Sequence, residues 1–300
     1  MPPSIKNVFL TGGTGFIGAQ VAKELVSHGY AVRGLARSNA SAAKLESLGV
    51  TAVRGDLTTL DVAVAEANAA DAVVHLAVDF TALNESLEQE KHFIAAVGAA
   101  YKGTGKTFLI TSGTFIGIGS GRTPFTEADD GVPGRVRYDV EATLRALGGD
   151  GVRALVIRPP LVHGDVPTGL VRAIIEKPKA LGYAPVVEGG AAKWPYVDVA
   201  DLAVVYRLAL EKAPEGFSRY HGVDESTPNR AVADAAAEHW GVPVKEVTVE
   251  EATKIYGFFG SFLGSDNTVS SEATRAALGW EIKGKRFLDK LEDGTYWKQL

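Results

Sequence analysis

The chain has 300 residues, among them 34 glycines, one methionine and no cysteine. This length suffices for a substantial apolar core, and 46% hydrophobic with 22% charged residues is the composition of a folded protein rather than a disordered one. Because cysteine is absent, disulfides, thiol nucleophiles and cysteine zinc sites are excluded. The formal net charge of −5 gives no general attraction to nucleic acid or to an anionic membrane.

No apolar run in the chain approaches the ~18 residues that a membrane span needs. The segment 1–6 lacks the apolar core of a signal peptide, because a strand-like run follows at once. We therefore expect a cytoplasmic location, with neither a nucleic acid nor a membrane as partner.

The first half of the chain alternates short β-branched runs with helical patterns. Strands are expected at 8–10, 31–36, 51–54, 72–76, 107–111 and 153–158. Helices are expected at 15–27, 40–48, 60–68 and 83–101, and after a glycine-rich loop at 113–134 one further helix reaches about Leu147. Such regular alternation is typical of the α/β class with a doubly wound parallel sheet.

The second half is less regular, because prolines divide it into short pieces. Its clearest helical patterns are 199–210, 229–240 and 271–278. We predict a sheet domain formed by 1–164 together with about 196–215. The segments at about 165–195 and 216–300 are expected to form a smaller, mixed α/β substrate lobe.

A glycine-rich turn, TGGTGFIG at 11–18, lies between the first strand and the first helix. In this context Gly12 permits the tight turn, Gly15 lets the backbone approach a pyrophosphate, and Gly18 lets the helix pack closely on the sheet. The start of the helix then offers free N–H groups to an anion. The turn predicts a dinucleotide-binding Rossmann fold; the alternative is a glycine-rich turn without a ligand.

The end of the second strand indicates which dinucleotide is bound. Proteins that select NAD place an acidic residue about 20 residues beyond the glycines, but this chain has no carboxylate between Glu24 and Glu46. Arg37 and Ser38 stand there instead, and an arginine fork suits a 2′-phosphate. We predict NADP(H), with NAD(H) less favoured; the alternative is that Arg37 is a solvated loop residue.

Asp56 and Leu57 close the third strand. Asp56 could accept a hydrogen bond from the adenine amino group while Leu57 packs on the ring. Equally, Asp56 could cap the helix that starts near Thr58.

The sequence resembles an extended short-chain dehydrogenase/reductase of the NAD-dependent epimerase/dehydratase superfamily over nearly its whole length. The motifs that carry the resemblance occur in the order of that family: the turn at 11–18, Gly55-Asp56-Leu57, His75-Leu76-Ala77, Thr111-Ser112-Gly113, 158–164 and 194–201. The resemblance implies that the segment after the fourth strand contacts the cofactor ribose and that 159–162 approaches the nicotinamide. The expected cofactor-binding residues are therefore Thr11, Gly12, Thr14, Gly15, Phe16, Ile17, Arg37, Ser38, Asp56, Leu57, Leu76, Ala77, Val78, Pro159, Leu161 and Val162.

The family's proton-transfer chemistry rests on a Tyr-x-x-x-Lys pair, in which the lysine lowers the pKa of the tyrosine. Here Tyr138 is followed by Ala142 at the lysine position, and an alanine cannot supply that cation. The segment resembles instead an atypical subgroup with an Arg-x-x-x-Glu pair, here Arg137 and Glu141. Tyr138 is then incidental. Ser112 matches the family serine, which holds a substrate oxygen; otherwise it caps a turn.

Arg137 and Glu141 are four residues apart and would share a helical face. They form either a surface ion pair of small effect or a buried pair beside the nicotinamide, with Glu141 as the proton acceptor or orienting group. If Tyr138 is the acid, Arg137, Arg145 or the oxidised nicotinamide itself must supply the cation that helps it. His163 is a further candidate for proton transfer. The catalytic candidates are Ser112, Tyr138, Arg137 and Glu141. The histidines have no metal-ligand spacing, so no metal site is expected.

These features favour an NADP(H)-dependent reductase that acts on a carbonyl or related unsaturated group of a small organic molecule. Two alternatives remain open: a redox-neutral epimerase, isomerase or dehydratase, and a non-catalytic NADP(H)-sensing regulator. The aromatic run 257–263 either lines an apolar substrate pocket or packs the smaller lobe. A monomer or a homodimer is expected.

Overall fold

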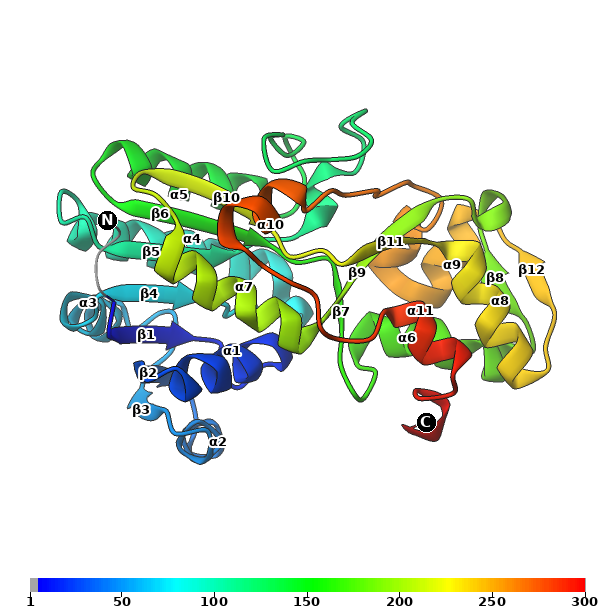
Figure 1. Cartoon of the computed structure of the whole chain (residues 1–300), viewed down its shortest axis with the longest axis horizontal. Coiled ribbons are helices and arrows are strands. Elements are labelled where there is room, and N and C mark those ends of the chain that lie inside the picture. Colours follow the sequence, from blue (N-terminus) through cyan, green and yellow to red (C-terminus); the bar gives the residue numbers. More distant parts are fainter. Residues whose placement is uncertain (1–4, 300) are drawn as a thin grey trace.

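A computed structural model describes residues 5–299 of the chain (Figure 1). Residues 1–4 and 300 lie outside the described part, so most of the segment on which the signal-peptide expectation rests is not tested. Within the described residues, no helix combines the length and apolar character that crossing a membrane requires.

The larger part of the molecule is built on a seven-stranded sheet in the order β10-β6-β5-β4-β1-β2-β3. Every neighbouring pair in this sheet is parallel. The strands are β1 (Asn7–Thr11), β2 (Ala31–Ala36), β3 (Thr51–Arg54), β4 (Ala72–His75), β5 (Thr107–Thr111), β6 (Arg153–Arg158) and β10 (Phe217–His221). The expected doubly wound parallel fold is therefore confirmed.

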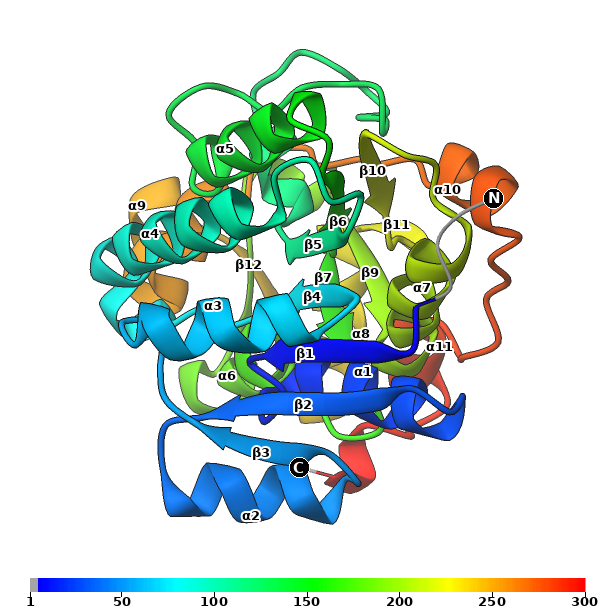
Figure 2. The same cartoon turned by 90° about the vertical axis from the view of Figure 1, so that its left-hand side faces the viewer.

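Helices cover both faces of this sheet (Figure 2). On one face, α3 (Leu60–Ala69), α4 (Leu83–Tyr101) and α5 (Tyr138–Gly149) bury an apolar layer around Phe93, Val97 and Leu144. On the other, α1 (Phe16–Ser27), α2 (Asn39–Ser47) and α7 (Val199–Lys212) pack around Leu25 and Tyr206. Strands buried on both sides explain the uninterrupted apolar runs of the sequence.

A second lobe lies beyond the carboxyl ends of the sheet strands. It holds a three-stranded sheet of β11 (Glu225–Pro228), β9 (Lys193–Asp198) and β7 (Leu161–His163), and a two-stranded sheet of β12 (Val244–Glu246) and β8 (Ala184–Val186). Its helices are α6 (Gly169–Leu181), α8 (Asn229–Trp240), α9 (Val249–Tyr256) and α11 (Phe287–Glu292). Short 3-10 helices are η1 (Phe80–Ala82), η2 (Thr114–Gly117), η3 (Glu188–Gly190), η4 (Gly257–Phe262) and η5 (Trp297–Gln299).

The expected domain boundary at 215/216 needs one correction. Strand β10 pairs with β6 inside the main sheet, and α10 (Glu272–Leu278) buries Leu278 in the same core as α7. The sheet domain therefore includes β10 and α10 in addition to α7, although β10 and α10 lie within the segment 216–300 that was expected in the substrate lobe. Short polar strands such as Phe217–His221, with arginine and histidine inside, gave no periodic signal in the sequence.

Candidate functional site

A cavity of about 360 Å³ opens at the carboxyl ends of β1 to β4. This is the edge at which open parallel sheets bind ligands. Its lining combines the glycine-rich turn with the segments that follow β2, β3 and β4: Gly12, Thr14, Gly15, Leu35, Arg37, Ser41, Gly55, Asp56, Leu57, Leu76, Ala77, Val78, Asp79, Ser86 and Gln89.

The glycines of the turn are required by close backbone packing. A Cβ on Gly12 would stand 2.6 Å from the backbone of Leu76 and Ala77, and Gly12 has a positive φ of 71°. A Cβ on Gly18 would stand 2.1 Å from the carbonyl oxygen of Gly12. Helix α1 begins directly behind the turn, and its N-cap, Gly15, offers no side-chain acceptor to the first N–H groups. These groups fit an anion such as a pyrophosphate.

Arg37 extends from the end of β2 into the cavity wall, and its side chain is 78% exposed. Ser38 does not line the cavity: it caps α2 by accepting a hydrogen bond from the backbone N–H of Ser41. Ser41 lies on the cavity wall instead. Lys44, one turn further along α2, donates to the carbonyl oxygen of Thr14 over 2.8 Å and so ties the helix to the glycine-rich turn.

Asp56 lies in the turn that precedes α3, whose N-cap is Thr59. Its Oδ1 accepts hydrogen bonds from the backbone N–H and the hydroxyl of Thr58, and these hold its pKa below the usual value. Asp56 also lines the cavity beside Leu57. The hydrogen bonds from Thr58 occupy Oδ1 of Asp56, and Oδ2 is available to a ligand.

The remaining expected cofactor contacts lie outside this cavity. Phe16 is 38% exposed at the start of α1, whereas Ile17 packs towards the core. Pro159 follows β6, and its carbonyl oxygen accepts the N–H of Thr114. Leu161 belongs to the core of the second lobe and Val162 packs against that of the sheet domain. Their proposed approach to the nicotinamide stays a prediction.

A buried polar network contacts Thr11, the first residue of the glycine-rich turn. Glu90 on α4 is fully buried. Its carboxylate oxygens accept hydrogen bonds from both terminal nitrogens of Arg137, over 2.5 and 2.8 Å. His75 Nε2 lies 3.2 Å from the same carboxylate, while its Nδ1 lies 2.6 Å from the hydroxyl of Thr11. Burial alone would raise the pKa of Glu90, but Arg137 and His75 outweigh it and hold the pKa below its usual value. Arg137 also donates to the carbonyl oxygen of Thr111.

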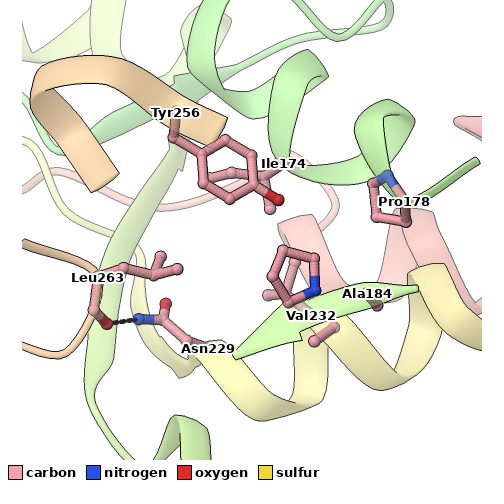
Figure 3. Close-up of a pocket in the computed structure, with 9 residues that line it drawn as sticks. Ile174, Pro178, Ala184, Asn229, Val232, Tyr256 and Leu263 are labelled. Atoms are coloured by element: carbon pink, nitrogen blue, oxygen red, sulfur yellow. Dashed lines mark hydrogen bonds between the residues drawn. The ribbon is translucent and has the colours of Figure 1, made fainter. Parts of the chain in front are cut away.

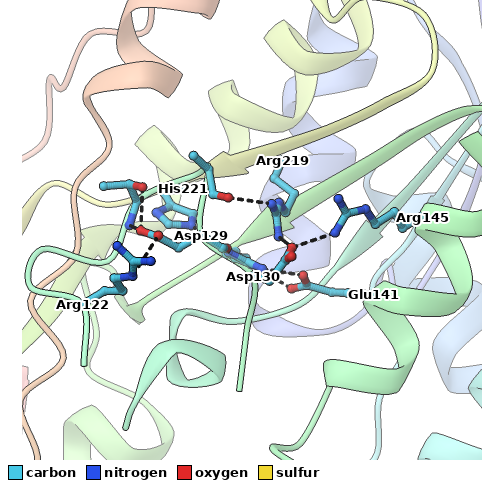
Figure 4. Close-up of polar contacts among 10 residues, drawn as sticks. Arg122, Asp129, Asp130, Glu141, Arg145, Arg219 and His221 are labelled. Atoms are coloured by element: carbon cyan, nitrogen blue, oxygen red, sulfur yellow. Dashed lines mark hydrogen bonds and ion pairs between the residues drawn. The ribbon is translucent and has the colours of Figure 1, made fainter. Parts of the chain in front are cut away.

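The expected pair of Arg137 with Glu141 is wrong. Arg137 stands at the N-cap of α5 with a left-handed backbone (φ 78°), so it lies outside the helical spacing and its side chain reaches Glu90. Glu141 instead accepts two hydrogen bonds from the buried Arg158 at the end of β6, over 2.9 and 2.6 Å. Figure 4 shows Glu141 among the charged side chains gathered there, where Arg145 and Arg219 share Asp130.

Ser112 and Tyr138 have different surroundings. The Ser112 hydroxyl follows β5 and is buried, and it has no hydrogen-bond partner within residues 5–299. Such an orphaned hydroxyl fits a substrate oxygen. The Tyr138 ring packs on an apolar cluster that contains Ile116 and Phe125. Neither Ser112 nor Tyr138 lines the 360 Å³ cavity.

His163 is fully buried, which together with the neighbouring Lys290 lowers its pKa to about 4. Its Nδ1 lies 2.8 Å from the hydroxyl of Tyr296, and that hydroxyl donates to the carbonyl oxygen of Gly164. Lys290 also donates to this carbonyl and to Asp198. The histidine is therefore neutral at physiological pH and part of a cluster that fixes the C-terminal segment.

The second lobe contains a cavity of about 20 Å³, lined by Ile174, Val232, Tyr256 and Leu263 among others (Figure 3). It has room for about one water molecule and not for a substrate. The aromatic run of η4 packs the smaller lobe, one of the two expected alternatives: Phe259 and Phe262 pack against the core of that lobe together with Phe115. Their rings contact that of Phe115, with centroids 5.4 and 6.2 Å apart. Phe258 remains 52% exposed.

Comparisons with known proteins identify the family. Residues 8–220 match the NAD dependent epimerase/dehydratase family. The chain belongs to this family. It is 34% identical to an uncharacterised protein of Schizosaccharomyces pombe over 96% of this chain and 99% of the relative. An uncharacterised protein of Saccharomyces cerevisiae is 35% identical over 91% and 94% of the two chains.

Solved structures share the fold. The crystal structure of gox2253 superposes with a TM-score of 0.75 at 19% identity and covers 98% of both chains. The dTDP-glucose 4,6-dehydratase DesIV from Streptomyces venezuelae, solved as a double mutant with NAD bound, has a TM-score of 0.74 at 19% identity and covers 97% and 96%. At such identity these likenesses establish the Rossmann-type architecture of this family member, not its reaction.

Proposed function

We propose that this family member is an NADP(H)-dependent oxidoreductase that reduces a carbonyl or related unsaturated group of a small organic molecule. The observation that carries the proposal is the guanidinium of Arg37 on the wall of the 360 Å³ cavity, beyond a turn shaped for a pyrophosphate. An arginine fork suits the 2′-phosphate that distinguishes NADP from NAD.

Two curated relatives support redox chemistry. A ketoreductase of Stigmatella aurantiaca that acts on a 3,4-dihydroquinoline-1-oxide is 24% identical over 69% of this chain and 65% of its own. A decarboxylating sterol-4-alpha-carboxylate 3-dehydrogenase of Dictyostelium discoideum is 38% identical over 85 residues, 28% of this chain and 26% of its own.

In the proposed reaction the bound cofactor supplies the hydride, and this chain's residues bind and polarise the acceptor. The Ser112 hydroxyl donates a hydrogen bond to the substrate oxygen. Arg137 donates a hydrogen bond to the carbonyl oxygen of Thr111, which directly precedes Ser112, and so helps to position the Ser112 hydroxyl towards the substrate oxygen. Glu90 and His75 hold the guanidinium in place, and water supplies the proton that completes the product hydroxyl.

The test is a panel of small carbonyl compounds incubated with the protein and NADPH. Stoichiometric oxidation of NADPH with formation of the alcohol is the expected result. Product formation without net NADPH oxidation would instead assign redox-neutral chemistry. Tight NADPH binding in calorimetry with no turnover on the whole panel would favour the sensing regulator and overturn the proposal.

A further inference from the structure

A carboxylate from outside the second strand stands beside Arg37. Asp79, in the segment after β4, lines the same cavity, and its Oδ2 lies 3.9 Å from a terminal nitrogen of Arg37. Within residues 5–299 it is the one carboxylate that approaches this guanidinium within 4 Å. Although the sequence has no acidic residue near the end of β2, the fold brings the Asp79 carboxylate to this place.

The Asp79 carboxylate is fixed in place and ionised. Its Oδ1 accepts hydrogen bonds from the backbone N–H of Thr81, over 2.9 Å, and from the Thr81 hydroxyl, over 2.6 Å. These bonds hold the pKa of Asp79 below its usual value. Since Oδ1 is used in this turn, Oδ2 is the oxygen that faces Arg37 and the cavity.

The pair has opposite consequences for the two pyridine dinucleotides. A 2′-phosphate would be attracted by Arg37 and repelled by Asp79, which also competes for the same guanidinium. A free ribose 2′-hydroxyl brings no negative charge to the pair and can donate a hydrogen bond to a carboxylate.

We propose that Asp79 is a coenzyme-selectivity residue, which neutralises Arg37 and lets the cavity accept NAD(H) as well as NADP(H). This inference rests on the proposed function, because it assumes that a pyridine dinucleotide occupies the cavity. It predicts that the wild-type preference for NADPH is weaker than Arg37 alone would produce.

The size of the effect follows from the exposure of both groups. Two unit charges about 4 Å apart in water change an equilibrium by about fivefold. The side chains of Arg37 and Asp79 are 78% and 44% exposed, so the aqueous value applies and salt screens it. Exposure also means that substitutions at these positions leave the core untouched.

The experiment is calorimetric titration of the full chain with NADPH and with NADH, for wild type, Asp79→Asn and Arg37→Ala. The matched control is Glu238→Gln, which removes the same charge from an exposed position on α8 in the second lobe. For Asp79→Asn we expect the ratio of the NADH to the NADPH dissociation constant to rise about fivefold at low salt, and less at high salt. In Arg37→Ala the ratio should fall towards one.

An unchanged ratio in Asp79→Asn, or an equal rise in Glu238→Gln, would overturn the inference while leaving the proposed function intact. If wild type binds neither dinucleotide, the proposed function fails and this inference fails with it. Because the readout is binding, neither outcome depends on knowing the substrate.

Discussion

At the level of single residues, the two hydroxyl groups that the family would use together have different surroundings. Ser112 presents a buried hydroxyl without a partner in the described residues, next to the carbonyl group held by Arg137. Tyr138 is the first residue of α5, directly after the left-handed residue Arg137, and its ring packs on Ile116 and Phe125. Four residues after Tyr138 stands Ala142, whose side chain carries no cation that could lower the pKa of the tyrosine.

Substitution of the two hydroxyls should therefore give unequal results. Ser112→Ala removes a donor to the substrate oxygen and is expected to lower kcat by about 10²-fold. Tyr138→Phe should retain most of the activity. Steady-state kinetics with NADPH and an active carbonyl substrate measures both, and circular dichroism checks folding. Equal, large losses in both variants would restore Tyr138 as the acid.

At the level of elements, the Glu90 network joins parts of the chain that are distant in sequence. It links α4, the start of α5, the end of β5 and, through His75, the end of β1. A charge pair buried this deeply is costly when one partner is removed, because the remaining charge stays uncompensated.

Glu90→Gln is expected to lower the free energy of unfolding by about 3 kcal/mol, since it leaves the Arg137 guanidinium buried without its counter-charge. Glu88→Gln on the same helix is the control, because Glu88 is exposed and pairs only with Lys91 among the described residues. Urea unfolding of both variants provides the measurement. A Glu90→Gln chain as stable as the control would show that the network contributes little.

On the scale of the whole molecule, two buried histidines tie stability to pH. Burial first, and then the nearby Arg158, lowers the pKa of His221 to about 3, and His163 is lowered to about 4. In the unfolded chain both return to about 6.5. Below that pH the unfolded state binds more protons than the folded state, so the free energy of unfolding falls as the pH falls.

Each of these histidines should contribute a slope of about 1.4 kcal/mol per pH unit between about pH 6.5 and 4. Urea unfolding across this range, for wild type and His163→Gln, measures the slope, and the variant should lose roughly one histidine's share of it. His92→Gln, at an exposed position on α4, serves as the control. The same slope in wild type and His163→Gln would contradict the assignment of His163 as a buried neutral histidine.

Local patterns in the amino-acid sequence were sufficient to predict the regular elements and the glycine-rich turn. Periodicity placed α4 at 83–101 and β5 at 107–111, because buried strands and long amphipathic helices repeat their apolar residues regularly. The glycines at 12 and 18 marked the turn, because no larger residue fits there. The pairing of charges was decided only by the tertiary structure. A left-handed backbone at Arg137 turned its side chain to Glu90, 47 residues away, and the end of β4 brought Asp79 to Arg37. Long polar side chains choose partners by spatial proximity, and spacing along one helix does not contain that information.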